Sequence, residues 1–280
     1  MLKHTFCHSV RLSALNEQSL WKKGYLTWED IIWAKNLPLT YKQAQIVLDT
    51  CRQSAFHLGN LDAGFFYNLL PSKEHWRLFK DFRKQTAYFD IETNGLDHEK
   101  HHITTIVLYD GEQLRHYVHG KNLEDFGKDI QKYKVLVSYN GKTFDAPFIR
   151  KSLNIPLNHA HIDLRYILGG LGYRGGLKNC ERQLKVDRPG LEEVDGFMAI
   201  LLWEYYKKFR SKKALETLLA YNALDVINLE VLMIIAFNQK ISQTPFSHLR
   251  IPMPTAPQMT LLPDKEIIRK IKYLHRYNRL

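Results

Sequence analysis

Residues 215–237 limit the possible folds most, because apolar side chains surround almost the whole circumference of the helix that they predict. A helix that is apolar on all sides is packed between layers of a protein and does not lie on its surface. Asp225 stands within this stretch, and Tyr221 lies four residues earlier, on the same helix face. The sequence therefore predicts a buried central helix that carries a carboxylate.

The region before this helix has strand and helix patterns in turn. A buried strand is expected over 87–92, and a β-hairpin with its turn at Asp110-Gly111 follows it over 103–119. Three consecutive strands, a helix, a strand and further helices predict an α/β fold, a mixed sheet covered by helices. The elements expected after the hairpin are a helix over 123–132, a strand over 135–139, and helices over 144–153 and 197–209.

The two ends of the chain differ from this middle region. Residues 1–84 predict a helical N-terminal segment, with capping-box patterns at 27–30 and 40–43. Within it, Trp76, Phe79 and Phe82 alternate with basic residues, a pattern that favours a core face over a nucleic-acid surface. We divide the chain into 1–84, a sheet-containing domain over 85–240, and a Pro-containing linker with a basic tail over 241–280. That tail either binds phosphates or folds back on the core.

Charge and cysteine usage restrict the partners and the compartment. The 280 residues include 40 Lys+Arg and 29 Asp+Glu, and the net charge of +11 favours a polyanionic partner such as nucleic acid. Three scattered cysteines form no CxxC pair, which is typical of a reduced, cytoplasmic chain. The longest continuous apolar runs are much shorter than the roughly 20 residues of a membrane span, so no membrane association is expected.

Four carboxylates stand where solvation does not explain them. Asp90 and Glu92 are two apart on the first strand, so both side chains point to one face of the sheet. Asp145 follows a strand and a turn at the start of a helix, and Asp225 lies in the central helix. Carboxylates brought together raise one another's pKa, and Mg²⁺ or Mn²⁺ relieves that repulsion. Two such ions, roughly 3.5–4 Å apart, catalyse displacement at phosphorus, and Tyr221 is placed to hold the attacking water.

Taken singly, these residues have simpler explanations. Asp145 alone fits a helix N-cap, and Tyr221 with Asp225 fits a satisfied buried pair. Asp163 is equally compatible with a fifth acid near the site and with a helix cap. We interpret Lys178 and Glu181 as a surface pair one helical turn apart. Residues 169–176 predict a flexible glycine-rich loop near the rim of the site. Zinc binding is less favoured than a solvated loop for His98, His101 and His102.

Three motifs in order resemble a known family. Residues 89–93, 139–147 and 221–225 resemble the three exonuclease motifs of the DnaQ-like 3′–5′ exonucleases. The tyrosine four residues before the last aspartate is typical of the DEDDy branch. Within that branch the chain is most similar to the YprB-type ribonuclease H-like exonuclease domain, with further similarity at 161–164, at 176–181 and in the lead-in segment 17–30.

This resemblance implies a ribonuclease H-like fold whose mixed sheet has three antiparallel strands followed by parallel strands. It also implies two Mg²⁺ or Mn²⁺ ions. Asp90 would bridge both ions, Glu92 and Asp225 would complete the tighter site, Asp145 would hold the second ion, and Tyr221 would orient the water. The implied substrate contacts are Asn140, Phe144, Thr93 and Lys178.

The sequence-based hypothesis is a metal-dependent 3′–5′ exonuclease that acts on single-stranded 3′ ends, on DNA more than on RNA. Two alternatives stay open at this point. One is a nucleic-acid-binding module that keeps the fold without turnover, and the other is a structure-selective endonuclease. The sequence predicts no particular protein partner.

Overall fold

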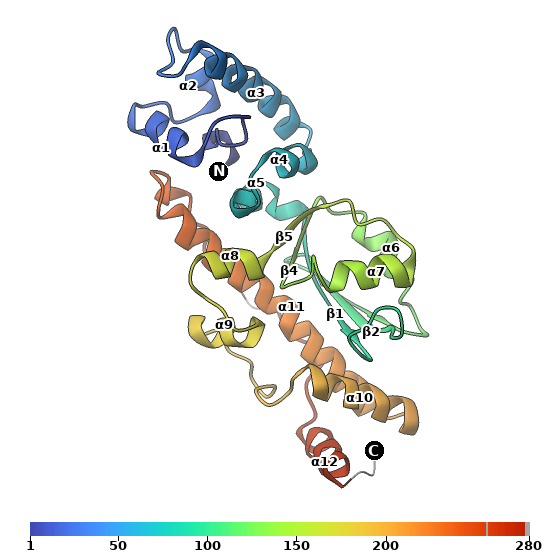
Figure 1. The fold of residues 1–280 in the computed structure, drawn as a ribbon. Coiled ribbons are helices and arrows are strands. Elements are labelled where there is room, and N and C mark those ends of the chain that lie inside the picture. Colours follow the sequence, from blue (N-terminus) through green and yellow to red (C-terminus); the bar gives the residue numbers. More distant parts are fainter. Residues whose placement is uncertain (256, 278–280) are drawn as a thin grey trace.

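A five-stranded mixed sheet forms the centre of the computed structural model, which describes residues 1–255 and 257–277 (Figure 1). The strand order is β3-β2-β1-β4-β5, with antiparallel pairing among β1, β2 and β3 and parallel pairing of β4 with β1 and β5. The predicted mixed sheet is therefore confirmed. The strands are β1 (Thr86–Thr93), β2 (Ile103–Tyr109), β3 (Leu114–Val118), β4 (Val135–Ser138) and β5 (Ala160–Asp163).

Strand β5 was not predicted from the sequence. Its four residues include His161 and Asp163, so no apolar run marks it, although all four are buried. It forms because β4 leaves an edge to which Ala160–Asp163 can pair in parallel. Strand β5 thereby ends beside the turn that follows β4.

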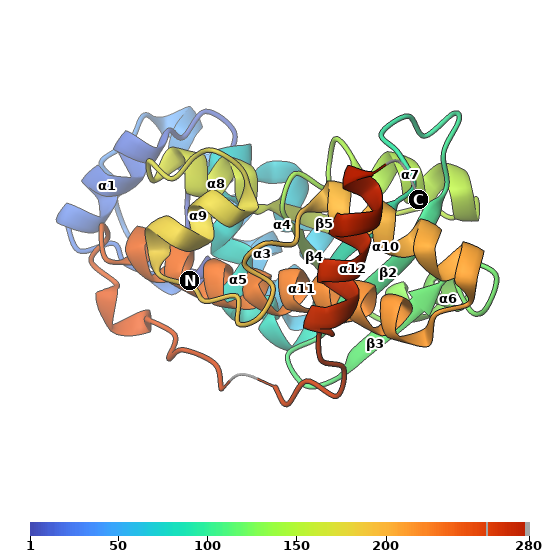
Figure 2. The same cartoon turned by 90° about the horizontal axis from the view of Figure 1, so that it is seen from below.

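Helices cover both faces of the sheet. Helices α6 (Asp125–Ile130) and α7 (Asp145–Leu153) pack against alternate β1 residues such as Phe89 and Ile91. Helix α11 (Lys212–Ile241) runs along the other face, where Tyr88 and Val137 lie (Figure 2). Because strand side chains alternate, Asp90 and Glu92 point toward α11.

Helix α11 is buried on all sides, as its sequence predicts. By length and composition alone it could cross a membrane, but 89% of its most apolar window is buried inside the protein. Helix α10 (Gly196–Phe209) packs beside it, and α8 (Leu164–Gly170) and α9 (Leu177–Leu184) lie between β5 and α10 in the chain. Helix α11 is therefore the central element of the core.

The N-terminal helices continue the same apolar core. Both predicted capping boxes form, at Thr27 and at Thr40. Trp76, Phe79 and Phe82 are at most 3% exposed, so they form a core face and not a nucleic-acid surface. The elements are α1 (Ala14–Lys22), α2 (Trp28–Ile32), α3 (Tyr41–Gly59), α4 (Ala63–Leu69) and α5 (Leu78–Phe82), with 3-10 turns at Leu2–His4, Ser72–Arg77 and Arg83–Gln85.

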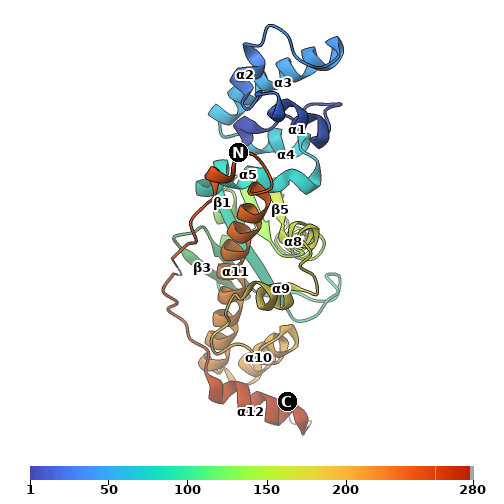
Figure 3. The same cartoon turned by 90° about the vertical axis from the view of Figure 1, so that its left-hand side faces the viewer.

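The basic tail folds back on the core. After the 3-10 turn Ser247–Leu249, α12 (Lys265–Arg276) places Ile267, Ile268 and Ile271 against α10 and α11 (Figure 3). Its basic residues stand on the outer face. The structure thus favours the second of the two sequence interpretations of this segment.

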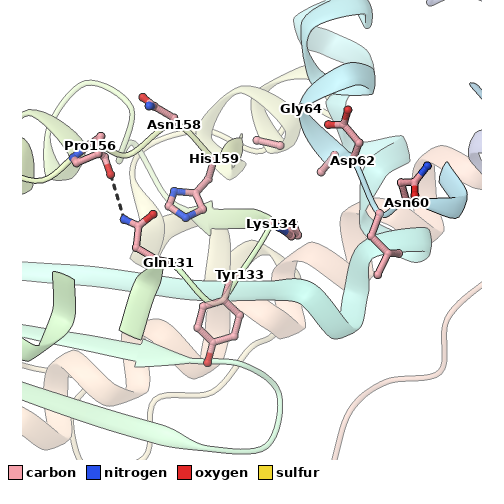
Figure 4. Close-up of a pocket in the computed structure, with 12 residues that line it drawn as sticks. Asn60, Asp62, Gly64, Gln131, Tyr133, Lys134, Pro156, Asn158 and His159 are labelled. Carbon is pink, nitrogen blue, oxygen red and sulfur yellow. Dashed lines mark hydrogen bonds between the residues drawn. The ribbon is translucent and has the colours of Figure 1, made fainter. Parts of the chain in front are cut away.

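A polar pocket of about 410 Å³ lies at the N-terminal ends of the parallel strands β4 and β5 (Figure 4). It is lined by residues just before β4 and β5, including Lys134 and His159, and by the link between α3 and α4. The predicted acid Asp145 follows the C-terminal end of β4. The pocket is therefore separate from the site described next.

Candidate metal centre

Three carboxylates converge between the sheet and α11. Asp90 and Glu92 come from β1, and Asp225 comes from α11. One oxygen from each lies within 4.8 Å of the others. Glu92 is 9% exposed and Asp225 is 4% exposed, so the cluster is almost removed from water.

Asp145 contacts the same strand, β1, from the start of α7. It is the first residue of α7, and its Oδ1 accepts a hydrogen bond of 3.1 Å from the backbone N–H of Ile91, between Asp90 and Glu92. Phe144 is the N-cap, so the helix-cap explanation of Asp145 is wrong. The turn before it needs glycine at position 141, because a Cβ there would lie 2.2 Å from Ser138 Oγ.

Burial and mutual repulsion make this cluster unfavourable without a cation. Desolvation and the charges of Asp145, Glu92 and Asp225 raise the pKa of Asp90 well above its usual value. Desolvation and the charges of Asp225 and Asp145 likewise raise the pKa of Glu92. Burial also raises the pKa of Asp145 to about 7. The uncharged forms are favoured until a positive charge enters the site.

Two basic side chains sit next to these acids. Arg188, which is 8% exposed, forms an ion pair with Asp225 and donates to both carboxylate oxygens of Glu181 at 2.9 Å. Asn228 Nδ2 donates to Glu181 at 2.7 Å. Although Arg188 and Lys178 lower the pKa of Asp225, burial still raises it. The arginine thus connects a metal-site acid to a second buried acid.

Sequence reasoning missed this connection. Glu181 is fully buried, so its interpretation as half of a surface pair is wrong. Arg188 lies in the irregular segment between α9 and α10, where no periodicity marks a residue as buried. Lys178 does face the cluster, with Nζ 4.7 Å from the centre of the Tyr221 ring, and it also donates to the carbonyl of Val194.

Asn222 is a further residue that the sequence analysis did not select. Its Nδ2 donates to Asp90 Oδ2 at 2.7 Å, and its Oδ1 accepts from Thr105 Oγ1 at 3.2 Å. It is a fully buried polar residue in an apolar helix. The signal that selected Asp225 therefore also applied to Asn222.

Tyr221 is 4% exposed and lies beside the cluster. Burial and the neighbouring carboxylates raise the pKa of its hydroxyl, because ionisation would add a further negative charge. The hydroxyl also lowers the pKa of Asp225 through a hydrogen bond. Tyr221 therefore stays protonated and acts as a hydrogen-bond donor.

The other predicted substrate contacts, Asn140, Phe144 and Thr93, interact with residues outside the acid cluster. Asn140 Oδ1 accepts from Thr143 Oγ1 at 2.9 Å, and Phe144 packs against Phe148 with ring centres 5.1 Å apart and ring planes tilted by 54°. Thr93 Oγ1 donates to the carbonyl of Gly95 at 2.6 Å, so its hydroxyl faces the loop after β1.

Asp163 is a cap and a loop anchor. It accepts from the Arg165 N–H at the start of α8 and from the Asn140 N–H at 2.8 Å. Asp163 therefore caps α8, and its charge also helps to raise the pKa of Asp145, so it is both a helix cap and a further acid near the site. Within residues 1–255 and 257–277, the one detected group of three metal-ligating side chains is Asp90, Glu92 and Asp225, and no histidine of the 98–102 loop joins it.

The donor set fits a hard divalent cation. All of its ligand atoms are carboxylate oxygens, which Mg²⁺ and Mn²⁺ prefer over the nitrogen and sulfur ligands typical of zinc. A divalent ion would neutralise the repulsion among these buried carboxylates. Asp90, Glu92 and Asp225 would hold such an ion.

Stabilisation by Mn²⁺ is expected to increase with pH across neutrality. The Asp145 carboxyl, with its pKa raised to about 7, favours the metal-free fold below its unfolded pKa of 3.8, and this contribution is lost as the pH rises through about 7. Metal binding needs the ionised form. The melting-temperature gain at fixed MnCl₂ relative to EDTA should therefore be larger one pH unit above 7 than one unit below. Asp145→Asn should flatten this dependence, and equal gains at both pH values would contradict the assignment.

No curated protein sequence matches the chain. Two solved structures are similar to it: the family B DNA polymerase of the archaeon Pyrobaculum calidifontis and a nuclease in its apo form. The polymerase is 15% identical, with a TM-score of 0.39, over 59% of this chain and 26% of its own, so the chain spans about a quarter of the polymerase. The nuclease is 18% identical, with a TM-score of 0.41, over 62% of this chain and 79% of its own.

The family comparison covers more than half of the chain. The model of the RNase H superfamily matches residues 87–236, from the start of β1 almost to the end of α11. This range includes all five strands and every acid of the candidate metal centre. The chain therefore belongs to the RNase H superfamily.

Proposed function

We propose that this protein is a divalent-metal-dependent 3′–5′ exonuclease that removes nucleotides from single-stranded ends, on DNA more than on RNA. Membership of the RNase H superfamily supports nuclease chemistry. The direction, the substrate and the use of two ions rest on the motif order 89–93, 139–147 and 221–225.

One observation carries the proposal. Three carboxylates from an apolar strand and an apolar helix place their oxygens within 4.8 Å of one another, and Asp145 bonds to the same strand. A structural role would not require like charges at this burial, because their repulsion destabilises the fold. A site for cations explains both their burial and their proximity.

When bound, the ions would stabilise the charge that develops at phosphorus and lower the pKa of a water molecule. The chain's own residues perform the remaining tasks. Asn222 fixes the orientation of Asp90 through the 2.7 Å hydrogen bond. The Tyr221 hydroxyl, which hydrogen-bonds Asp225 here, is the group that we assign to orienting the attacking water. Lys178, beside Tyr221 and Asp225, adds positive charge where a phosphate would lie.

End-labelled strands test the proposal directly. A strand labelled at its 5′ end should shorten one nucleotide at a time in Mg²⁺ or Mn²⁺, and EDTA should stop the reaction. A closed circular single strand should stay intact, because it offers no 3′ end. Nicking of the circle would favour an endonuclease, and salt-sensitive binding without any metal-dependent cleavage would favour a binding module.

Tyr221→Phe is expected to lower kcat by about 10- to 100-fold, since a hydrogen bond to a charged or reacting group contributes about 1.5–3 kcal/mol. Mn²⁺ affinity, measured by calorimetry, should stay the same because the carboxylates are unchanged. Tyr88→Phe is the matched control, because its hydroxyl is buried without a hydrogen-bond partner in the described part of the chain. Full kcat in Tyr221→Phe would remove this residue from the mechanism.

A further inference from the structure

A groove of about 780 Å³ opens at the turn after β4, the turn that leads to Asp145. One wall is the turn after β4, and the other is the segment that runs from α8 to the start of α9. Four glycines leave room in this second wall, and the side chains that line the groove are Tyr139, Asn140, Arg165, Tyr166, Tyr173 and Arg174. No acidic side chain is among these described lining residues.

Both walls lead into the metal centre. The turn that contains Asn140 continues within five residues to Asp145. The opposite wall ends at Gly176, the N-cap of α9, and α9 carries Lys178 and Glu181 toward the cluster. A strand whose last phosphate lay at the acids would therefore extend into this groove.

The charge of the groove complements a phosphodiester strand. Arg165 and Arg174 are exposed, and Arg165 donates to Asn140 Oδ1. The Arg174 guanidinium has no ion-pair partner in the described ranges. When no metal ion is bound, the acids would repel a nucleic-acid strand. Arg165 and Arg174 would attract it instead.

The aromatic rings indicate unpaired bases. Tyr166 is 57% exposed and lies next to Arg165, so its ring can stack on a base. Tyr139 and Tyr173 are half-buried, and their hydroxyls contact Cys180 and Gln239. Positive charge combined with exposed rings is the arrangement by which proteins hold single strands, whereas bases in a duplex are already stacked on each other.

Glycine forms the part of the wall closest to the centre. Gly175 and Gly176 have φ of +97° and +86°, values that other residues rarely adopt. The space beside Gly176 is open, so a phosphate can approach the main chain there, whereas the Asn179 side chain packs against Gly175. The same positive φ values explain why this segment is glycine-rich without a phosphate-loop motif.

We infer that this groove binds the nucleotides that precede the 3′-terminal one on single-stranded DNA. The inference rests on the proposed function, because that function places the terminal phosphate at the acids. Arg165 and Arg174 would contact phosphates, and Tyr166 would stack on a base.

Strand binding in EDTA tests the groove without any turnover. The probe is a 5′-fluorescein oligothymidylate, and its anisotropy is followed with increasing salt. Arg165→Ala with Arg174→Ala should weaken binding about tenfold and reduce the salt slope by about 1.4, since each single-strand phosphate contact contributes about 0.7. Tyr166→Ala should weaken binding at least about 5-fold, because stacking contributes about 1–3 kcal/mol per base.

The control removes the same charge elsewhere. Lys84→Ala with Lys128→Ala changes two exposed lysines that do not line the groove, and it should leave the salt slope close to that of the wild type. Equal losses in both double variants would overturn the inference, as would a blunt duplex that binds as tightly as the single strand.

Photo-crosslinking gives a second, independent measurement. Bromodeoxyuridine placed two to four nucleotides from the 3′ end should crosslink within residues 164–176 or to Tyr139 or Asn140, and crosslinks elsewhere would overturn the inference. Binding and hydrolysis are measured separately. A wild-type protein that binds through the groove but cleaves nothing would refute the proposed exonuclease and support the groove.

Discussion

Asp90→Asn is expected to abolish cleavage and, in EDTA, to stabilise the fold. Cleavage should fall at least about 100- to 1,000-fold, because metal-assisted charge stabilisation is worth several kcal/mol and each 1.36 kcal/mol is tenfold in rate. Stability should rise because burial and three neighbouring carboxylates raise the pKa of Asp90, and the amide removes that repulsion. The gain should be about 1–2 kcal/mol, the size typical of stabilising substitutions.

Two measurements check these opposite effects on cleavage and on stability. Cleavage is followed with a labelled strand in Mn²⁺, and the free energy of unfolding is taken from urea titration in EDTA. Asp49→Asn removes a carboxylate that is 64% exposed on α3, and it should alter neither value. An Asp90→Asn protein that cleaves normally, or that is less stable than the wild type without metal, would show that these acids do not form a cation site.

Arg188→Met is expected to cost about 3–5 kcal/mol of stability in EDTA, because removing one partner leaves buried charges without compensation. Glu181 is fully buried and Asp225 is 4% exposed, so both would lose their main positive neighbour. Saturating Mn²⁺ should recover part of this loss, since the ion replaces positive charge at Asp225 but not at Glu181. Differential scanning fluorimetry with and without Mn²⁺ measures both effects.

Two further variants identify the cause. Arg188→Met combined with Glu181→Met removes both charges of the pair, and it should be more stable than Arg188→Met alone. Lys132→Met is the control, because Lys132 is 55% exposed in its ion pair with Asp129 and should contribute little. If Arg188→Met in EDTA melts at the wild-type temperature, the ion pair with Asp225 has no structural role.

The sequence predicted the parts of the site that periodicity marks. Asp90, Glu92 and Asp225 interrupt an apolar strand and an apolar helix, so their burial follows from the pattern. Asp145 was predicted from its place after a strand and an Asn-Gly turn. The sequence spacing does not show which of their oxygens approach one another. That depends on the strand order of the sheet and on how α11 crosses β1.

The residues that support these acids were harder to predict. Arg188 and Glu181 belong to a loop and to a short helix with mostly polar composition, where charged residues are usually exposed. Their burial arises only when α9 packs against α11. Strand β5 was missed for a related reason, since pairing with β4, and not its own composition, makes it a strand.

The length of α11 connects Asp225 to a distant part of the molecule. Phe237 lies about 18 Å along the helix axis from Asp225, and there it packs on Trp76 and Phe79, with ring centres 5.6 and 6.2 Å apart. Those two aromatic residues belong to the N-terminal helical region. A fragment cut before β1 would expose this end of the helix, so the first 84 residues help to hold in place the helix that carries Asp225.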